Sequence, residues 1–385
     1  MERHPLYCIL PPHMLKQIAT NGTEAQKQMA VKNLVASSRM RGQRQDAREL
    51  VAFSRALGTD VKTRTIYDAK QGNTLPGMVV RQEGDLPSPD PAVNEAYDYS
   101  GATYDLYRNI YSRNSIDANG MKLDSSVHYQ KGYDNAFWNG QQMVYGDGDE
   151  DLPPAQQLFT RFTKSIDVVG HELTHGVTQF EANLTYYQQS GALNESISDV
   201  FGSLVKQYQL KQSAADADWI IGAGLFTANV NGKGIRSMKE PGTAYNDPVL
   251  GKDPQPGHMK DYLTTNSDNG GVHINSGIPN HAFYFVAFEI GGFAWEKAGL
   301  IWYLTLKDKL KYDSDFQSCA NLTWQVAGEK FGAGSLEQQA VKKGWDAVGI
   351  DATQGGGGTP TPPPSGEGCP VSLMRKLGLL NPSSK

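Results

Sequence analysis

The chain has 385 residues and a formal net charge of −5, from 36 lysines and arginines against 41 aspartates and glutamates. This length is enough for two or three lobes with substantial cores, and the slightly acidic balance lacks the basic footprint of a nucleic-acid-binding protein. Three widely spaced cysteines, Cys8, Cys319 and Cys369, argue against a disulfide framework.

The first residues carry no recognisable targeting signal. They contain neither an apolar h-region nor a small-residue cleavage site, so an ordinary secretory signal is not expected. No apolar run approaches the length of a membrane span, so we expect no membrane partner. The protein is therefore expected to be cytoplasmic as synthesised, with secretion by a non-classical route as the alternative.

Residues 1–57 are predicted to form a small first unit. Thr23 and Gln26 have the spacing of a capping box, which opens a helix. After a basic, loop-like stretch at 37–45, a second helical pattern runs from Asp46 to Leu57. Because so short a unit cannot build a robust core of its own, we expect it to pack on the domain that follows.

Residues 58–165 are predicted to form a strand-rich lobe with one helix over Ala92–Ser112. The acidic, glycine-rich run Gly146–Asp151 is expected to be a surface loop, either a solvated turn or a calcium-binding loop. The predicted strands alternate in polarity and are bounded by turn residues: Val61–Tyr67, Met78–Arg81, Ser126–Tyr129 and Gln142–Tyr145.

The central motif is His171-Glu172-Leu-Thr-His175. On a helix, residues four apart lie on the same face, so the two imidazoles can bind one metal ion from one side. Glu172 is turned by about 100° around the helix axis, where it can take a proton from a metal-bound water without being a ligand. This geometry is typical of zinc peptidases. The alternative is that the histidines cap a buried helix turn.

The following helical pattern, Gly191–Asp199, offers a third ligand in Glu195. A catalytic zinc has three protein ligands and one open position. Asp199, four residues later on the same face, can hold the second ring nitrogen of one ligating histidine, and Asn194 can hold the other. The alternative is an exposed acidic helix face.

The rest of the chain to Gly349 is predicted to be mostly helical, and the linker and short tail at 353–385 have a glycine- and proline-rich composition followed by basic and apolar residues. The predicted helices beyond the metal motif are Ser276–Ile290, Trp295–Leu310 and Asp315–Phe331.

Taken together, the two metal-binding segments resemble the thermolysin-like metallopeptidases, from about Arg64 to Ile350. The start of the chain, Pro11-Pro-His-Met-Leu15, resembles the short propeptide of the protealysin-like branch. Four further segments agree with the family in the same order: Arg64–Ala69, Val93–Asp98, Asn135–Trp138 and Gly270–Gly277.

The resemblance implies an α+β fold with two lobes. The strand-rich N-terminal lobe would span 58–165 and the zinc-binding, helical lobe 166–352, with the zinc helix between them and 1–57 as a small helical propeptide. We expect a monomeric zinc endopeptidase that binds one catalytic ion and acts on protein or peptide substrates. The competing hypotheses are a binding protein on a catalytically silent scaffold and a structural zinc module.

The resemblance also assigns roles around the zinc. Glu172 would act as the proton-transfer group, Tyr186 and His273 would stabilise the tetrahedral oxyanion, and Asp268 would orient His273. The neighbouring Tyr187 is the alternative candidate for the oxyanion-binding tyrosine. Taken singly, Tyr186 could be ordinary packing and His273 a core histidine.

The resemblance also assigns residues to substrate binding. Asn135 and Ala136 would lie on the edge strand that binds the substrate backbone, and Arg236 would bind the substrate carbonyl beyond the cleaved bond. Arg236 alone could equally be a surface ion pair. Cleavage before bulky apolar residues is implied by an apolar pocket that would be formed by Phe159, Val168, Ile221 and Ile235.

One departure concerns calcium. Asp167 and Asp218 match the family's double-calcium site, but Lys206, Ile220 and Ala223 stand where carboxylates are expected. Calcium requires six to eight oxygen ligands, so we expect it to be absent from this site and Lys206 to pair with Asp167 or Asp218 instead.

The propeptide motif of Pro11, Pro12, His13, Met14 and Leu15 is expected to lie in the substrate cleft and keep the precursor inactive. Met14 or Leu15 would occupy the apolar pocket. Cys8 or His13 could instead cap the zinc directly. Activation would cut the chain between about Ser37 and Leu57.

Overall fold

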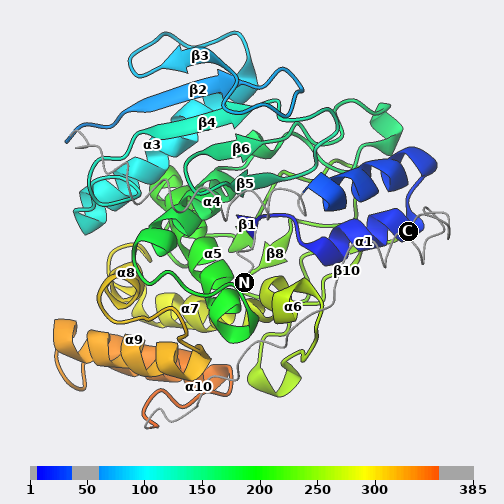
Figure 1. Ribbon diagram of the computed structural model, residues 1–385. Helices are drawn as coiled ribbons and strands as arrows, with labels where there is room; N and C mark the ends of the chain where they lie inside the picture. The colour runs from blue at the N-terminus through cyan, green and yellow to red at the C-terminus, as the bar shows by residue number, and fades with distance from the viewer. Residues whose placement is uncertain (1–6, 37–59, 355–385) are drawn as a thin grey trace, which may run out of the picture.

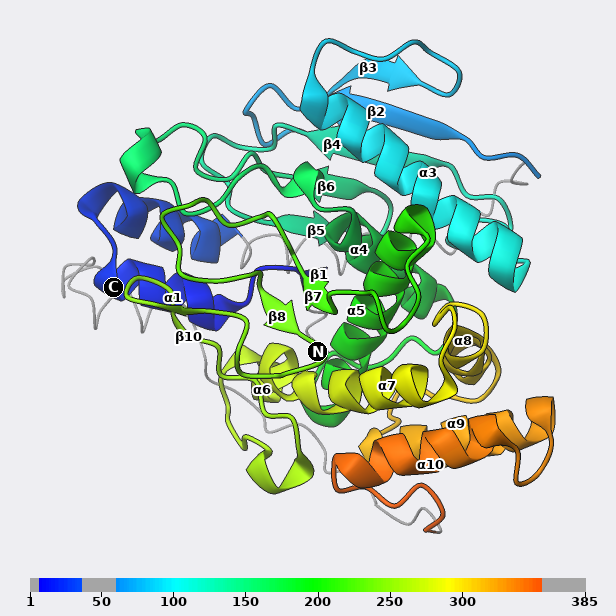
Figure 2. The same cartoon turned by 180° about the vertical axis from the view of Figure 1, so that it is seen from behind.

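The computed structural model describes residues 7–36 and 60–354 (Figure 1). The predicted helix Asp46–Leu57, the basic loop before it and the C-terminal linker and tail lie outside these residues. The α+β class is confirmed: a mixed sheet with one long helix forms one end of the molecule, and a layer of helices forms the other (Figures 1 and 2). No helix in the described ranges is both long and apolar enough to cross a membrane.

The sheet has six strands in the order β1-β5-β6-β4-β2-β3. β6, β4 and β2 are parallel neighbours, and the other pairs are antiparallel. β1 comes from the first unit, so β5 forms the edge of the remaining sheet. The strand bounds are β1 Tyr7–Cys8, β2 Arg64–Asp68, β3 Met78–Gln82, β4 Leu123–Val127, β5 Ala136–Trp138 and β6 Met143–Tyr145.

Helix α3, Pro91–Tyr111, packs against β2 and β4 and closely matches the predicted Ala92–Ser112. Asp90 caps it by accepting from the N–H of Ala92 at 2.9 Å, and Pro91 occupies the first turn, where a missing N–H costs nothing. The helix ends where Ser112 takes a left-handed conformation.

Two central helices, α4 (Ile166–Phe180) and α5 (Gln188–Leu210), carry the metal motif and pack closely along each other. Two glycines allow this approach. A Cβ on Gly202 would lie 2.4 Å from the carbonyl oxygen of Asp167, and a Cβ on Gly170 would lie 3.1 Å from the Cα of Gly202. Side chains there would force the helices apart, so the glycines set the distance between the ligands on α4 and α5.

The C-terminal half is helical, as predicted, and adds two short hairpins. α10 was not singled out from the sequence, although Ser335 and Gln338 have capping-box spacing and the N–H of Gln338 donates to Ser335 Oγ at 3.2 Å. The remaining elements are β7 Ile220–Ile221, β8 Arg236–Ser237, β9 Asn246–Asp247, β10 Gly251–Lys252, α6 Asp268–Asn275, α7 Gly277–Ile290, α8 Ala298–Asp308, α9 Phe316–Phe331, α10 Leu336–Ala347 and the 3-10 turns Pro154–Gln156, Phe162–Lys164 and Met259–Asp261.

The first unit contributes β1, helix α1 (Pro12–Asn21) and a helix at 24–36, which lie together beside the sheet edge (Figure 1). The predicted capping box is present: the N–H of Thr23 donates to Gln26 Oε1 at 2.7 Å. Gln26 also donates to the carbonyl of Gln156 at 2.7 Å. The unit therefore packs on the rest of the chain, as expected.

Candidate active site

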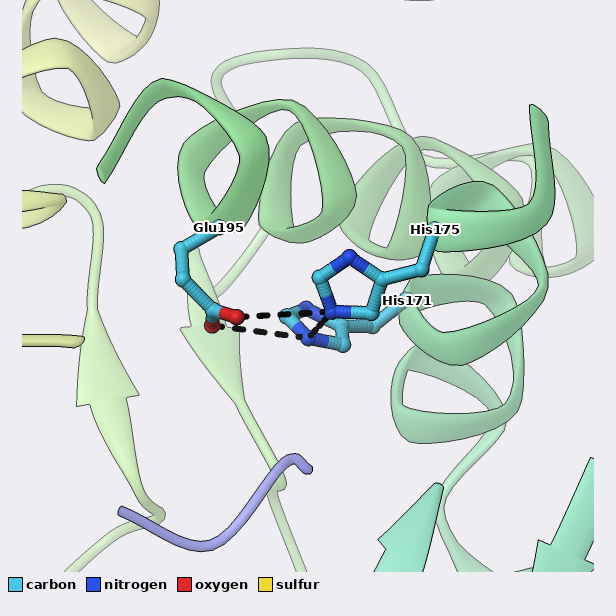
Figure 3. A group of neighbouring side chains, drawn as sticks. All are labelled: His171, His175 and Glu195. Atoms are coloured by element: carbon cyan, nitrogen blue, oxygen red, sulfur yellow. Dashed lines mark hydrogen bonds and ion pairs between the residues drawn. The ribbon is translucent and has the colours of Figure 1, made fainter. Parts of the chain in front are cut away.

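The side chains of His171 and His175 project from α4 toward Glu195 on α5 (Figure 3). The two Nε2 atoms lie 3.0 Å apart, and the carboxylate oxygens of Glu195 lie 3.6 Å from His171 Nε2 and 3.4 Å from His175 Nε2. Bonds of about 2.0–2.1 Å from a tetrahedral zinc would place neighbouring ligand atoms about 3.3 Å apart. The donor set and its spacing therefore fit one zinc ion, and within the described ranges no other group of potential metal ligands was found.

The other ring nitrogens are held as the helix spacing predicts. Asp199 Oδ1 lies 2.8 Å from His171 Nδ1, and Asn194 Oδ1 lies 2.8 Å from His175 Nδ1. Ser198, which the sequence did not suggest, adds a contact of 2.9 Å to the same His175 nitrogen. A proton on each Nδ1 leaves the Nε2 lone pairs directed at the metal position.

Asp199 is also held from the opposite side. Arg236 on β8 contacts it through two nitrogens, at 2.7 and 2.8 Å, and Asn280 donates to it at 2.8 Å. Burial would raise the pKa of Asp199, but the charge of Arg236 and the hydrogen bond with His171 outweigh burial and hold it well below its usual range. The carboxylate therefore stays ionised. Neither contact was predicted, because both partners are far from Asp199 in sequence.

Glu172 is fully buried and lies next to the strand expected to bind substrate. Its Oε2 accepts from the backbone N–H of Trp138 on β5 at 3.0 Å. This contact fixes the carboxylate between α4 and the sheet edge, adjacent to the two histidines without belonging to the ligand group. The position suits proton transfer to or from a water bound there.

Tyr186 and His273 meet beside Glu195. The Tyr186 hydroxyl donates to Glu195 Oε1 and lies 3.1 Å from His273 Nε2. His273 Nδ1 lies 2.7 Å from Asp268 Oδ1. Burial would lower the pKa of His273, but the Asp268 and Glu195 carboxylates raise it to about 9. Tyr187 lies outside this cluster, at the start of α5, so the geometry favours Tyr186 of the two tyrosines.

The predicted substrate-binding groups contact the first unit of the chain itself. The N–H of Ile9 donates to the carbonyl of Ala136 at 3.3 Å, and Arg236 donates to the carbonyl of Ile9 at 3.1 Å. Asn135 Oδ1 accepts from the N–H of Leu10 at 2.9 Å, and its Nδ2 donates to the Leu10 carbonyl at 3.4 Å. An extended segment of the first unit thus occupies these groups.

The extended segment lies earlier in the chain than the proline motif. Ile9 lies at the Arg236 contact, while Pro12–Leu15 form the first turn of α1, and the placing of Met14 or Leu15 in the apolar pocket stays a prediction. A helical turn uses its backbone groups internally, and prolines cannot donate to a strand ladder, so the paired segment has to precede Pro11. The two prolines were the signal that could have placed it.

The predicted pocket residues are all buried. They are at most 1% exposed and belong to the main core cluster, which also contains Ile9, Leu10 and Met14: Phe159, Val168, Ile221 and Ile235.

The alternative that Cys8 or His13 caps the metal is not favoured by these contacts. His13 Nε2 lies 3.1 Å from the Tyr245 hydroxyl, and Cys8 packs in a small cluster with Tyr129 and Phe137. Neither residue is part of the group of ligand atoms.

At the position of the expected calcium site, Lys206 lies between two carboxylates, as predicted. Its Nζ is 2.8 Å from Asp167 Oδ2, 2.8 Å from Asp218 Oδ1 and 2.6 Å from the carbonyl of Ile220. Burial lowers the pKa of Lys206, but the two carboxylates outweigh it and raise the pKa above its ordinary value. The ammonium therefore supplies positive charge at this place.

In the glycine-rich loop, Asp149 accepts from the N–H groups of Leu158 and Phe159, and Asp147 contacts His128. These acidic side chains thus have protein partners.

Comparison with known proteins gives consistent matches. Residues 41–179 match the model of the thermolysin metallopeptidase catalytic domain, and residues 182–350 match that of its alpha-helical domain. An extracellular metalloprotease of Pectobacterium carotovorum is 48% identical over 361 residues, covering 92% of this chain and 99% of its own. An extracellular minor metalloprotease of Serratia marcescens is 44% identical over 72% of this chain and 78% of its own.

The solved structure of the precursor of protealysin, a metalloproteinase from Serratia proteamaculans, is 51% identical. It superposes with a TM-score of 0.80 and covers 89% of this chain and 99% of its own.

Proposed function

Because the chain belongs to the thermolysin family of metallopeptidases, we propose that it is the self-inhibited precursor of a zinc endopeptidase that cuts on the amino side of bulky apolar residues. The observation that carries the proposal is the convergence of three ligand side chains, an adjacent Glu172 that contacts β5, and a Tyr186–His273 pair next to Glu195.

In this proposal His171, His175 and Glu195 hold the zinc. A zinc ion held by these residues would supply Lewis acidity for the substrate carbonyl and for a water. Glu172 then accepts a proton from that water and later passes it to the leaving amine. The hydrogen bond from the Trp138 N–H fixes one oxygen of Glu172 to β5, the strand proposed to bind substrate. The same strand therefore positions both the general base and the substrate.

Negative charge develops on the carbonyl oxygen of the tetrahedral intermediate and needs preorganised donors. The Tyr186 hydroxyl and His273 Nε2 are adjacent, at 3.1 Å, and can both turn to that oxygen. Asp268 accepts from His273 Nδ1 and also from its backbone N–H, at 3.0 Å. It therefore keeps the imidazole protonated and aimed, a positioning role.

Substrate binding would use Asn135 and Ala136 on the strand edge and Arg236 for the carbonyl beyond the cut. The apolar character of the nearby core supports a preference for apolar residues there, although such pockets discriminate by only a few kcal/mol. In the precursor, Ile9 and Leu10 take these same contacts, so a substrate cannot reach them until the first unit, residues 1–57, leaves.

We also infer that the mature enzyme needs zinc but no calcium at the Lys206 position, and that it acts as a monomer. The names of two relatives include the word extracellular, which supports export of this protein over a purely cytoplasmic role.

The decisive experiment is Glu172→Gln. Because an amide cannot accept the proton, the variant should bind zinc with unchanged stoichiometry and lose at least about 10²–10⁴-fold in casein cleavage. Removing the first unit with a trypsin-like protease should raise the activity of the wild-type protein and leave the variant silent. Near-normal turnover by the purified variant would refute the mechanism.

A further inference from the structure

The docked segment runs in a defined direction along β5. Tyr7 pairs with Trp138 and Cys8 with Phe137 in antiparallel register, and the Ile9 N–H then donates to Ala136. Residues 7–9 therefore form one extended strand near the zinc ligands. This strand lies against the groups that the proposed function assigns to substrate.

The two carbonyls on either side of one peptide bond have distinct partners. The Cys8 carbonyl oxygen lies 3.0 Å from His273 Nε2, the proposed oxyanion donor, which is itself 3.1 Å from the Tyr186 hydroxyl. The Ile9 carbonyl accepts from Arg236, the proposed ligand of the carbonyl beyond the cut, at 3.1 Å. The Cys8–Ile9 bond thus lies between His273, the proposed donor to the reacting carbonyl, and Arg236, the proposed ligand of the next carbonyl along the chain.

We propose that the Cys8–Ile9 bond is this enzyme's own first substrate: the precursor hydrolyses it within the same molecule, and the cut leaves residues from Ile9 onward docked as an inhibitor. This inference rests on the proposed function. The segment has the direction, the carbonyl contacts and, at Ile9, the apolar residue that the function requires of a substrate.

The bond itself has no feature that would block hydrolysis. Ile9 is not a proline, and the next proline, Pro11, lies two residues beyond it, so the leaving nitrogen carries a proton, which it donates to the Ala136 carbonyl. The oxygen of a water bonds to the Cys8 carbonyl carbon, and the C–N bond to Ile9 breaks. One water proton passes through Glu172 to the Ile9 nitrogen. The second water proton is released from the new carboxyl group and taken up by the Ile9 amine, so the products are a carboxylate on Cys8 and an ammonium group on Ile9, and water is the sole co-reactant.

The two products are held very differently. The described part of the first product, Tyr7 and Cys8, is held by strand pairing with β5, by the Cys8 carbonyl contact with His273 and by packing of Cys8 beside Phe137. The second product keeps the buried face of α1, the Gln26 contact with Gln156 and a contact of 3.1 Å from Asn33 to Asp134. Residues 1–8 should therefore leave, while the part beginning at Ile9 stays. Cleavage here does not activate the enzyme, and a second cut after the 24–36 helix is needed.

The test is intact-mass spectrometry of zinc-loaded, full-length protein over time, at two protein concentrations. We expect a species beginning at Ile9 to appear before any other cut, at a rate independent of concentration, with casein cleavage still low. Glu172→Gln should not produce it. Ile9→Asp should slow it at least tenfold, Ile9→Leu should restore it, and Thr20→Ala, on the exposed side of α1, should not change it.

Hydrogen exchange in the uncut Glu172→Gln background gives a readout independent of catalysis. Amides of residues 8–10 should be protected, and adding Ile9→Asp should remove this protection while α1 stays protected, which also shows that the variant is folded.

The inference is overturned if the first unit is lost through other bonds while Cys8–Ile9 stays intact, if the cut depends on protein concentration, or if residues 8–10 exchange freely. Casein cleavage after trypsin treatment separates the two proposals: with that activity present, each of these results removes only the inference, whereas its absence would remove the proposed function as well.

Discussion

Replacing Lys206 with methionine should destabilise the folded protein strongly, because its ammonium is the charge partner of a fully buried carboxylate. Asp167 Oδ1 accepts from Ser165 Oγ at 2.7 Å and from the Gly222 N–H at 3.0 Å, whereas Oδ2 contacts Lys206 at 2.8 Å. Methionine has a similar length but no charge, so it leaves the buried Asp167 carboxyl without its charge partner.

Removing one partner of a buried ion pair costs about 3–5 kcal/mol. The second carboxylate, Asp218, is half-exposed, so its attraction to Lys206 is screened and adds little. At about 2 °C per kcal/mol for a protein of this size, the thermal midpoint of Lys206→Met should fall by about 6–10 °C. Lys343→Met, which breaks an exposed pair with Glu289, should change it by less than about 2 °C.

The assay is thermal unfolding of zinc-loaded protein in the Glu172→Gln background, which prevents self-digestion, with and without millimolar calcium. Calcium should not change the midpoint of the Lys206 protein or of Lys206→Met. It should raise that of Lys206→Glu, where three carboxylates then face one another. A calcium-dependent midpoint with Lys206 in place, or a loss in Lys206→Met no larger than in Lys343→Met, would refute the idea that the lysine substitutes for an ion.

Two further predictions concern the site and the sheet. Asp199→Asn should weaken zinc binding by about 10–100-fold in competition with a chromophoric chelator, because the His171 ring loses its charged acceptor; an unchanged affinity would contradict this role. The hydrogen bond to Asp147, helped by Asp90, outweighs burial and raises the pKa of His128 to about 9, so the stability it contributes is complete below about pH 6.5 and is lost as pH rises through 9. Asparagine tolerates the left-handed backbone at this position, so His128→Asn should make the thermal midpoint fall less steeply between pH 7 and 9.5. An equally steep fall in both proteins would be evidence against a stabilising ion pair of His128 with Asp147 and Asp90.

The zinc ligands could be predicted from the sequence because their geometry is local. His171 and His175 share a face of one helix by spacing alone, and Glu195 and Asp199 share a face of the next. Helix α3 and the Thr23 capping box were predictable for the same reason, since caps and periodicity act over a few residues. The pairing of Lys206 with Asp167 or Asp218 was predicted from the family resemblance, which places all three residues at one site, together with the attraction of opposite charges there.

The register of the first unit depended on the tertiary structure. Strand pairing between Cys8 and Phe137, or between Ile9 and Ala136, joins residues more than 120 positions apart, and a shift of a few residues along the edge leaves the local pattern unchanged. The sequence therefore does not reveal that Ile9 and Leu10, which precede the prolines, contact the strand edge.

The contact of Arg236 with Asp199 also could not be predicted from local sequence. From the sequence it was assigned to substrate, but its guanidinium also binds Asp199 in a bidentate pair and thereby supports His171. Which buried charges meet is decided when β8, α5 and α7 pack together, because the cost of leaving a charge unpaired selects partners by distance in space and not along the chain. The ligands were determined by local sequence, and the surroundings that orient them by the packing of distant segments.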